Sequence, residues 1–291
     1  MPRFRDTPPT LSIIVPVLNQ SRTMIDTMSA LKPFRQRGAE IIVVDGGSDD
    51  DTAVLAHPFA DRVVKGPRGR AAQMNEGAKV ASGFIFLFLP TDTTLPADAD
   101  TQVMIGRARD TSVWGRFDMR LTGRHPLLPI VARLLNRRSR SSGIASCEQA
   151  IFVQRETFFR IGGFTDIPVM EDVEISKRLR AISPPICVTS RVTVPAKRFD
   201  RDGLWTTLRT MWIMRLRYRM GMKPEEILKR YVEPKPRPAS VKTRESGRPR
   251  ASVNPQMTPP ADRASRAQVS GTERKKTGPS SAGSRQVRKR T

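Results

Sequence analysis

Polar side chains stand directly after three apolar runs in the N-terminal part of the sequence. Asn19 follows LSIIVPVL, Asp45 follows IIVV, and Asp92 follows IFLFLPT. A carboxylate at the end of a buried strand can accept hydrogen bonds from a nucleoside, and it can also bind a divalent cation. On local evidence each aspartate is equally well explained as a turn residue, so its chemistry depends on what the fold places beside it.

A pair of carboxylates begins a later segment, EDVEISKRLRAI. Glu171 and Asp172 stand where a helix is expected to start, and the helix dipole alone would favour them there. The functional alternative is a general base, which an enzyme that transfers a group to a hydroxyl requires. Repulsion between two neighbouring carboxylates would raise the pKa of such a base toward neutrality.

The elements around Asn19, Asp45 and Asp92 alternate between strand and helix patterns. The segments near residues 21–31 and 70–81 predict helices. Four apolar, β-rich runs before, between and after these segments predict strands. The expected strands are Leu11–Val17, Glu40–Asp45, Asp61–Lys65 and Phe84–Leu89. Continuously apolar strands that alternate with helices indicate a parallel sheet covered on both faces, so the predicted fold class is α/β. Ligands bind such sheets beyond the carboxyl ends of the strands, where these three side chains stand.

The segment after Asp45 predicts a tight turn and then a helix. Gly46 and Gly47 permit the turn and the close approach of a ligand to the backbone. Ser48 is a favourable N-cap residue, and the aspartates at 49–51 would lie in the first turn of the helix. The pattern is not GxGxxG, and no GxxxxGK[ST] occurs, so Rossmann-type dinucleotide sites and P-loops are not predicted.

The second half of the chain follows a different pattern. Residues Val113–Leu121 alternate between apolar and polar types, which predicts a half-exposed, antiparallel strand. A further strand is expected at Gln149–Val153, and a helix at Glu171–Ile182. Pro126–Arg140 and Gly203–Gly221 predict basic amphipathic helices, the second with tryptophans. These two helices fit core-facing packing with a solvated basic side, which we favour, or contact with an anionic membrane surface.

The chain carries a formal net charge of +23 over 291 residues, and this charge is unevenly distributed. Residues 233–291 hold 15 Lys and Arg against 4 Asp and Glu, with many Pro, Ser and Gly and almost no large apolar residues. Such a segment cannot bury enough surface to offset its ordering entropy, so we predict a disordered basic tail. The tail fits a role in solubility, or attraction to nucleic acid or anionic lipid.

The cysteines and the hydropathy pattern bear on the compartment. Cys147 and Cys187 are too few for a disulfide framework and predict reduced thiols in a cytosolic protein. No run approaches the roughly 18 apolar residues that a spanning helix needs. The expected location is the cytoplasm, with peripheral contact at the inner face of the cell membrane if the basic helices bind lipid.

Six segments occur in one order across residues 11–182, and together they are far more specific than apart. They are LSIIVPVLNQ, IIVVDGGSDDDT, GPRGRAAQMNEGAKVASG, FLFLPTDT, GIASCEQAIFVQRETFFRIGGF and VMEDVEISKRLR. Their order and spacing resemble the family 2 glycosyltransferases, and within them a bacterial subgroup associated with radical-SAM/selenodomain proteins that is similar to carotenoid-type glycosyltransferases. The resemblance extends from Leu11 to Tyr231 and implies a catalytic domain of GT-A fold at residues 1–232, followed by the tail at 233–291.

The resemblance implies transfer of a sugar from a nucleotide-diphospho-sugar, most often a UDP-sugar, to an acceptor hydroxyl with inversion and with Mg2+ or Mn2+. By likeness, Asp92 matches the metal-binding aspartate of the family and Asp172 matches its general base, with Glu171 beside it. The residues implied to bind substrate are Pro16, Val17, Asn19, Asp45, Arg70, Asn75, Gln149 and Arg198. The acceptor is not identified, a lipid or a small molecule both fit, and no specific nucleic-acid partner is expected.

The sequence departs from the family pattern around the expected metal site. Pro90-Thr91-Asp92 has one carboxylate where the family often has two, and Glu148 stands where an aspartate is common. A cation would therefore rest on Asp92 and the diphosphate. Two other functions stay open. One is another nucleotide-dependent transferase, which would need a glycine-rich loop with a lysine after the first strand. The other is a non-catalytic basic protein that binds nucleic acid or an anionic membrane.

Overall fold

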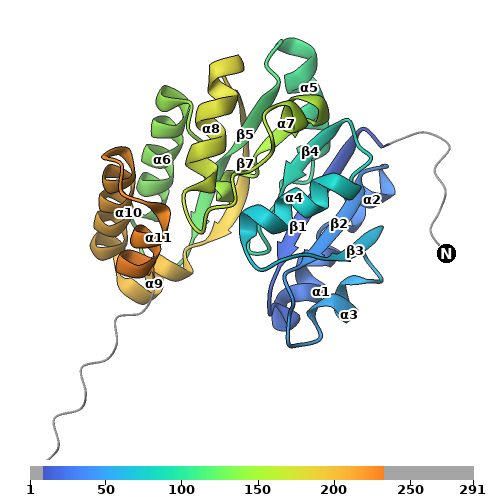
Figure 1. Cartoon of the computed structure of the whole chain (residues 1–291), viewed down its shortest axis with the longest axis horizontal. Coiled ribbons are helices and arrows are strands. Elements are labelled where there is room, and N and C mark those ends of the chain that lie inside the picture. Colours follow the sequence, from blue (N-terminus) through green and yellow to red (C-terminus); the bar gives the residue numbers. More distant parts are fainter. Residues whose placement is uncertain (1–8, 233–291) are drawn as a thin grey trace, which may run out of the picture. The chain divides into compact units, whose positions relative to one another are not determined.

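The computed structural model describes residues 9–232, and the tail predicted at 233–291 lies outside them. The described part is built on one seven-stranded sheet with the order β3-β2-β1-β4-β6-β5-β7 (Figure 1). The strands are β1 Leu11–Val17, β2 Glu40–Asp45, β3 Arg62–Lys65, β4 Ile85–Phe88, β5 Trp114–Thr122, β6 Phe152–Gln154 and β7 Ile186–Pro195. The predicted α/β class is confirmed, and the four strands expected in the N-terminal part are present.

The sheet has a parallel half and a mixed half. Strands β1 to β4 are parallel, as the alternation of strands and helices predicted. Their register pairs Val17 with Asp45 and Asp45 with Lys65, so β1, β2 and β3 end at one edge of the sheet. In the other half, β6 is antiparallel to both β4 and β5, and β5 is parallel to β7. Residues from the second half of the chain therefore reach the same edge.

Helices cover both faces of this sheet (Figure 1). In the first half they are α1 Ser21–Ser29, α2 Lys32–Gln36, α3 Thr52–Ala56, α4 Arg70–Val80 and α5 Ala99–Arg109. In the second half they are α6 Leu128–Ser142, the 3-10 helix Cys147–Gln149, α7 Arg155–Arg160, α8 Glu171–Ile182, α9 Lys197–Asp202, α10 Leu204–Arg219, α11 Pro224–Ile227 and the π-helix Leu228–Val232. The predicted helix Glu171–Ile182 is confirmed with both of its bounds.

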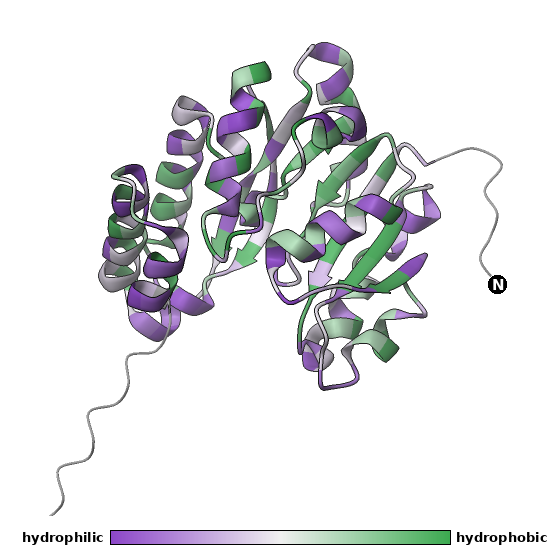
Figure 2. Ribbon diagram, viewed as in Figure 1, coloured by the Kyte–Doolittle hydropathy of each residue, from purple (hydrophilic) through white to green (hydrophobic). Residues whose placement is uncertain are grey.

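Alternate residues of the strands build two apolar clusters, one on each face, and Figure 2 shows the apolar colour concentrated on the strands. Ile13 packs in the cluster that includes Met24 of α1, and Ile14 packs in the cluster that includes Met74 of α4. The approach of α4 depends on Gly77, because a Cβ at that position would lie 2.4 Å from Cγ2 of Ile14. This close packing fixes α4, and with it the side chains that α4 carries toward the strand ends.

The half-exposed, antiparallel strand predicted at Val113–Leu121 is wrong in its exposure and only partly right in its pairing. The strand is β5, antiparallel to β6 but parallel to β7. Two of its polar side chains are buried, since Arg116 is fully buried and Asp118 is 9% exposed, whereas Arg120 is exposed. Arg116 donates to Asp118 Oδ1, and Arg140 of α6 donates to Asp118 Oδ2 at 2.6 Å. Because the charges are paired with one another, the polar face of the strand can lie inside the protein.

Two other sequence predictions are wrong for local reasons. Ser48 does not cap a helix, because α3 begins only at Thr52 and the Ser48 hydroxyl donates to Asp45 instead. Gln149 does not begin a strand, because it lies in the 3-10 helix and Ala150 follows it with a φ of 47°. Strand β7 and the helices α2, α5, α7, α9 and α11 are not among the elements predicted. The apolar residues of α5 form no clear stripe, which explains why its sequence gave no helical signal.

Candidate active site

The ends of β1 and β2 carry the first of the expected site residues. The carboxylate of Asp45 accepts a hydrogen bond from the backbone N–H of Ser48 at 3.1 Å. The N–H of Asn19 donates to Ser48 Oγ at 2.9 Å, and Asn19 Oδ1 accepts from the N–H of Asp49 at 2.9 Å. The loops that follow the two strands are thus fastened to each other. Asp45, which is 8% exposed, lies at their base.

Gln73 on α4, a residue that the sequence analysis did not predict for the site, forms hydrogen bonds with the ends of β1 and β2. Its Nε2 donates to the carbonyl of Val17 at 2.7 Å and to that of Val44 at 2.9 Å. Val44 is the register partner of Pro16. A Cβ on Gly46 would lie 3.0 Å from the Gln73 amide, so this contact favours glycine there. The glutamine therefore positions Pro16 and Val17, the predicted floor of the nucleoside pocket.

Asp92 lies in the turn that follows β4, beside a groove of about 210 Å³ between α1, this turn and the start of α9. Backbone hydrogen bonds of 2.9 Å join Thr94 to Thr193 and fix the turn to β7. Burial and the negative charge of Glu148 raise the pKa of Asp92, whereas the positive charge of Lys197 acts in the opposite direction. The carboxylate of Asp92 is therefore close to one acidic and one basic side chain from the second half of the chain.

Glu171 is buried at the start of α8 and connects α8 to α4. It is 2% exposed, and its Oε1 accepts a hydrogen bond from Arg70 Nε at 2.6 Å. The thiol of Cys147 donates to the same oxygen at 3.6 Å. The other oxygen, Oε2, has no hydrogen-bond partner among residues 9–232. Glu171 thus holds Arg70 next to the N-terminal end of α8.

Asp172, the next residue, has the chemistry of a base. Its Oδ2 accepts a hydrogen bond from the N–H of Cys147 at 3.2 Å. Burial and the negative charges of Glu171 and Glu148 raise the pKa of Asp172 to about 6, and two nearby arginines act in the opposite direction. A carboxyl group with this pKa is ionised at neutral pH and is a stronger proton acceptor than an ordinary aspartate.

Glu148 affects both the predicted metal ligand, Asp92, and the predicted base, Asp172. The sequence marked it only as a departure from the family pattern, without assigning it a role. In the structure its charge acts on both Asp92 and Asp172. Asp92, Glu148 and Asp172 therefore belong to one acidic cluster, although they come from three separate segments of the chain.

Strained backbone also gathers at these segments. Non-glycine residues with positive φ in residues 9–232 are Asn19 at 51°, Ala150 at 47° and Met170 at 69°. The first is itself a predicted site residue, and Met170 directly precedes Glu171. Such conformations cost free energy and persist where the surrounding contacts enforce them, often at functional sites.

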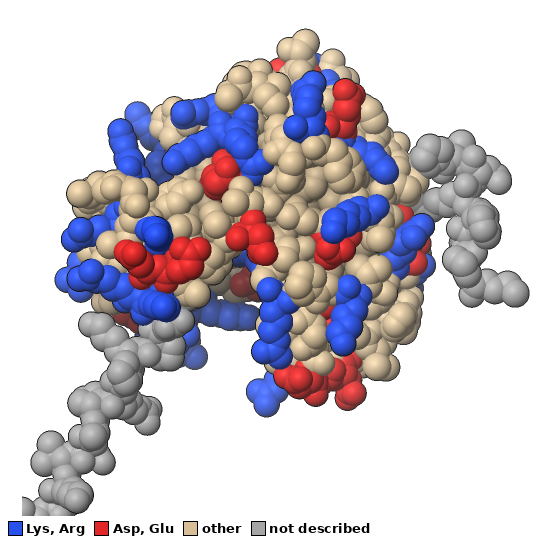
Figure 3. Space-filling view, viewed as in Figure 1, with Lys and Arg blue, Asp and Glu red and all other residues tan. Residues whose placement is uncertain are grey.

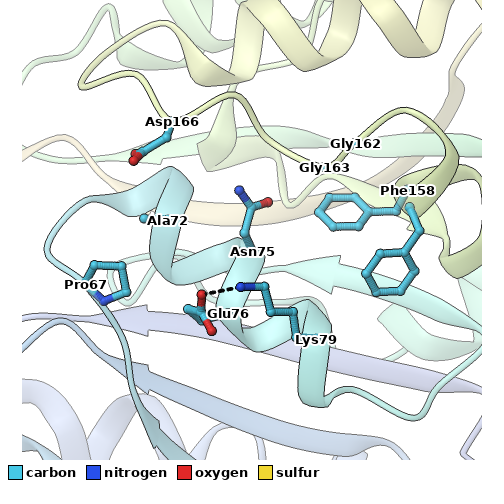
Figure 4. A pocket seen from close by; sticks show the side chains of 10 residues that line it. Pro67, Ala72, Asn75, Glu76, Lys79, Phe158, Gly162, Gly163 and Asp166 are labelled. Carbon is cyan, nitrogen blue, oxygen red and sulfur yellow. Dashed lines mark hydrogen bonds and ion pairs between the residues drawn. The ribbon is translucent and has the colours of Figure 1, made fainter.

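Two of the expected substrate-binding residues have their side chains fully engaged elsewhere. Asn75 donates to the carbonyl of Phe164 at 2.8 Å and accepts from its N–H at 2.9 Å. Figure 4 shows Asn75 beside a cavity of about 400 Å³ between α4 and the segment around Phe158. Gln149 is 1% exposed, and its amide bonds to the N–H of Ser146 at 3.1 Å and to the carbonyl of Phe117 at 3.3 Å. Both side chains hold segments of the fold together.

The last of the expected residues, Arg198, lies on α9. Its side chain is 41% exposed and forms a long ion pair of 3.9 Å with Asp202. Lys197, beside it, lines the groove at Asp92. The start of α9 therefore brings positive charge to the acidic cluster, as Arg70 does from α4.

Asp92 and Glu148 are the carboxylates that could hold a divalent cation. A cluster of three or more His, Cys, Asp or Glu side chains arranged around one metal position is absent from the part of the chain that the structure describes. Two carboxylates are nevertheless hard oxygen donors, and Mg2+ or Mn2+ commonly takes one or two of them together with phosphate oxygens and water. The residues present fit a cation whose coordination is completed by a diphosphate.

A parallel half-sheet that ends in Asn19, Asp45 and Asp92 is joined here to a mixed half-sheet that brings Asp172 to the same edge. This arrangement is that of a GT-A transferase. A sequence model of the family described as Glycosyl transferase family 2 matches residues 12–160. The chain therefore belongs to glycosyl transferase family 2 and is a glycosyltransferase. This membership decides against the two other functions that the sequence left open, whereas the radical-SAM/selenodomain subgroup and the carotenoid-type likeness stay predictions.

Bacterial proteins of similar sequence include a glycosyltransferase and a polysaccharide synthase. A PGL/p-HBAD biosynthesis glycosyltransferase of Mycobacterium tuberculosis is 30% identical over 209 residues, which cover 67% of this chain and 78% of that protein. A poly-beta-1,6-N-acetyl-D-glucosamine synthase of Staphylococcus epidermidis is 33% identical over 95 residues, covering 31% of this chain and 23% of that protein.

Solved structures share the fold at lower identity. TarS residues 1–349 of S. aureus in complex with UDP-GlcNAc gives a TM-score of 0.53 at 15% identity, over 64% of this chain and 58% of that one. The mannosyltransferase PcManGT of Pyrobaculum calidifontis, in complex with GDP-Man and Mn2+, gives 0.51 at 21% identity, over 77% and 69%. The chain thus spans less than two thirds of TarS 1–349, and these likenesses concern the fold.

Proposed function

We propose that this protein transfers a sugar from a nucleotide-diphospho-sugar to an acceptor hydroxyl, with inversion at the anomeric carbon and with Asp172 as the general base. The observation that carries the proposal is the acidic cluster, in which one member, Asp172, has a pKa of about 6 and experiences the positive charges of Arg70 and Arg215. The relatives are named as glycosyltransferases, and the similar folds hold UDP-GlcNAc or GDP-Man, which supports this reaction class.

The donor would bind at the ends of β1 and β2. Asp45 is a carboxylate at a strand end and would accept hydrogen bonds from the base or ribose, while Asn19 holds the neighbouring loop. Arg70 and Arg198 would offset the charge of the diphosphate from α4 and α9. We propose UDP as the nucleotide, because TarS in the similar structures binds UDP and UDP-GlcNAc.

The transfer would be a single displacement. Asp172 takes the proton from the acceptor hydroxyl while the hydroxyl oxygen attacks the anomeric carbon. The bond from that carbon to the diphosphate oxygen breaks on the opposite side, and its electron pair leaves with the nucleoside diphosphate. One such displacement inverts the anomeric centre. Arg70, held by Glu171 at 2.6 Å, stabilises the developing negative charge without having to reorganise.

The proposed cofactor is Mg2+ or Mn2+, held by Asp92 with Glu148. When bound, such a cation supplies Lewis-acid stabilisation of the charge on the leaving diphosphate. The mannosyltransferase of similar fold was solved with Mn2+, which supports the same choice here.

The donor proposal is tested by a thermal-shift screen of the full chain with UDP, GDP, UDP-GlcNAc and GDP-Man, each with and without Mn2+. Anything that binds the folded state alone raises the melting temperature, and a ligand at about 100 times its Kd adds about 2.7 kcal/mol of stability. Stabilisation by one nucleotide, larger with Mn2+, is expected. A melting temperature unchanged by all four compounds would refute the donor site.

We also propose peripheral contact of α6 and α10 with an anionic membrane on the cytoplasmic side. Large apolar side chains are exposed on these helices: Ile130 at 52% and Leu134 at 61% on α6, Trp205 at 74% and Trp212 at 67% on α10. Lys and Arg side chains gather over the same part of the surface (Figure 3). Within residues 9–232 no helix has the length and apolarity needed to cross a bilayer. Tryptophan and arginine together suit the interface of an anionic bilayer.

Vesicle co-sedimentation tests this contact. Binding to vesicles of phosphatidylcholine with phosphatidylglycerol, but not to phosphatidylcholine alone, is expected, and Trp205→Ser with Trp212→Ser should abolish it. The matched control replaces two exposed apolar residues elsewhere, Val54→Ser and Phe84→Ser. Equal binding of both double variants would remove α6 and α10 from the contact.

A further inference from the structure

Two arginines close to Asp172 have no part in the transfer step described above. Arg138 lies on α6 and Arg215 on α10, and side chains of α8 contact both helices. Arg180 of α8 donates to the carbonyl of Ser142 on α6 at 2.5 Å. Lys177 of α8 lies 4.9 Å from the centre of the Tyr218 ring on α10.

These contacts orient the two arginines. Ser142 is four residues after Arg138, and Tyr218 is three residues after Arg215, so each arginine shares a helix face with a residue that meets α8. The positive charge of Arg215 lowers the pKa of Asp172, and the negative charge of Asp172 raises the pKa of Arg138. Arg138 and Arg215 therefore converge on the N-terminal part of α8.

Arg138 lacks a partner for a buried donor. Its Nε is shielded from solvent and makes no hydrogen bond with any residue in 9–232. Burial and the repulsion of Arg215 lower the pKa of Arg138 to about 10, and Asp172 acts in the opposite direction. Within the described residues neither arginine forms an ion pair with a carboxylate. A buried unpaired N–H beside a second guanidinium is unfavourable unless an anion binds to both.

The position of the pair distinguishes it from the donor site. Arg70 pairs with Glu171 and acts on Asp172 through its charge from α4, on the parallel half of the sheet where the nucleotide is proposed to lie. Arg138 and Arg215 reach it from helices of the other half. A base must contact the acceptor hydroxyl, so charged groups on that other flank of Asp172 face the acceptor.

We propose that Arg138 and Arg215 bind a phosphate group carried by the acceptor, so that the sugar is transferred to a phosphorylated acceptor molecule. This inference rests on the proposed function, because it takes Asp172 as the base. Guanidinium groups bind phosphate through paired, charge-assisted hydrogen bonds, and the free Nε of Arg138 supplies one such donor.

The surroundings favour a lipid phosphate over a soluble one. Leu134 precedes Arg138 by one helical turn and is 61% exposed, and Trp212 precedes Arg215 by nearly one turn and is 67% exposed. An alkyl or prenyl chain attached to the bound phosphate could lie against these side chains. A soluble phosphorylated acceptor would present the same anionic group without that chain.

The test measures binding by isothermal titration calorimetry with the full chain, using decyl phosphate and inorganic phosphate as probes. The variants are Arg138→Gln and Arg215→Gln, and the matched controls are the exposed arginines of the same helices, Arg133→Gln on α6 and Arg219→Gln on α10. Each of the first two should raise the Kd for decyl phosphate about tenfold or more, as loss of a charge-assisted hydrogen bond does. The controls should change it by less than about twofold.

The two probes separate the sources of the phosphate. Much tighter binding of decyl phosphate than of inorganic phosphate identifies a lipid phosphate, and equal binding identifies a soluble phosphorylated acceptor; both support the site. The proposal is overturned if Arg138→Gln and Arg215→Gln bind decyl phosphate as the unchanged chain does. If Arg138→Gln fails to fold, which its thermal melt would show, Arg215→Gln decides alone.

Nucleotide binding by the same proteins separates this proposal from the donor site. Arg138→Gln and Arg215→Gln should keep the stabilisation by nucleotide and Mn2+ that the unchanged chain shows. If they lose it while decyl phosphate still binds, the arginines serve the donor diphosphate and the acceptor proposal fails. If no nucleotide stabilises the unchanged chain, the donor proposal fails instead, whatever the result with decyl phosphate.

Discussion

At the scale of single residues, the site depends on the mutual repulsion of carboxylates. Asp172 gains its raised pKa from burial, from its neighbour Glu171 in the same turn of α8, and from Glu148 in a separate segment of the chain. Arg70 forms its ion pair with Glu171 rather than with Asp172, so the carboxylate of Asp172, the proposed base, is free of a salt bridge with Arg70. The structure thus gives two adjacent acidic residues different surroundings.

Replacement of the base tests this division of roles. We expect Asp172→Asn to lower the rate of sugar transfer about 10²- to 10⁴-fold, the usual contribution of a general base, with nucleotide affinity nearly unchanged. Steady-state kinetics and the nucleotide thermal shift measure the two effects. Ser176→Ala, on the same helix and fully buried, serves as a control for damage to α8. Full turnover by Asp172→Asn would remove this residue from the mechanism.

The pH dependence of transfer follows from the same contacts. The base must be ionised, so the rate should fall by about tenfold per pH unit below a pKa of about 6 and level off above it. Glu148→Gln removes a negative charge and should move this acid limb to lower pH. Arg215→Gln removes a positive charge and should move it to higher pH. Shifts in the same direction for both variants would contradict an electrostatic origin of the pKa.

At the scale of elements, α4 connects the strand ends to the acidic cluster. Gly77 allows α4 to lie close to β1, Gln73 binds the carbonyls of Val17 and Val44, and Arg70 reaches Glu171 at the start of α8. Each of these contacts lies on a different turn of one rigid helix. A change in the packing of α4 would therefore move Val17, proposed to line the nucleoside pocket, together with Arg70, proposed to contact the diphosphate.

Loss of the Gln73 contacts should destabilise the protein measurably. Gln73→Leu removes the Gln73 donor from two buried carbonyls, although that of Val17 keeps a hydrogen bond from the N–H of Gly46. The expected cost is therefore about 1–3 kcal/mol of the free energy of unfolding in all. Urea unfolding followed by circular dichroism measures the change. Gln36→Leu, an exposed glutamine on α2, is the matched control and should stay within about 0.5 kcal/mol of the unchanged chain. Equal stability of the two variants would show that the carbonyls find other partners.

At the scale of the whole molecule, residues 9–232 place the half proposed to bind the donor and the half proposed to bind the acceptor on one continuous sheet. β6 runs antiparallel between β4 and β5 and so joins the halves without a hinge. The acidic cluster forms along this junction, because Asp92 comes from the first half while Glu148 and Asp172 come from the second. The proposed site residues therefore come from both halves of the sheet, and none of them lies in residues 233–291.

Removal of the predicted tail tests this division of the chain. A shortened protein that ends at Arg237 should keep its melting temperature and transfer sugar to a soluble acceptor within about twofold of the full chain, because the site residues all lie before the cut. Its affinity for anionic vesicles should fall, since the removed segment 238–291 carries 13 Lys and Arg. Loss of transfer to the soluble acceptor would show that the tail belongs to the catalytic unit.

The sequence alone determined the parallel half of the fold. The strands at Leu11–Val17 and Glu40–Asp45 are apolar on both faces, so both faces must be covered by helices. This pattern lies within a few consecutive residues and can therefore be recognised from the sequence. Their polar ends, Asn19 and Asp45, follow because the chain must leave a buried strand at its edge. The family resemblance then placed Asp92, Glu171 and Asp172 in expected roles, which the experiments above test.

Only the tertiary structure decided how the second half contributes. The alternation in β5 predicted solvent exposure, but Arg116 and Asp118 pair with each other and with α6, a contact that no pattern within one strand can reveal. Gln149 and Asn75, expected at the substrate, are taken up by backbone partners distant in the chain. The role of Glu148 and the convergence of Arg138 with Arg215 arise likewise from segments far apart in the sequence. Charges act through space, so their effects depend on distances that the order of residues does not contain.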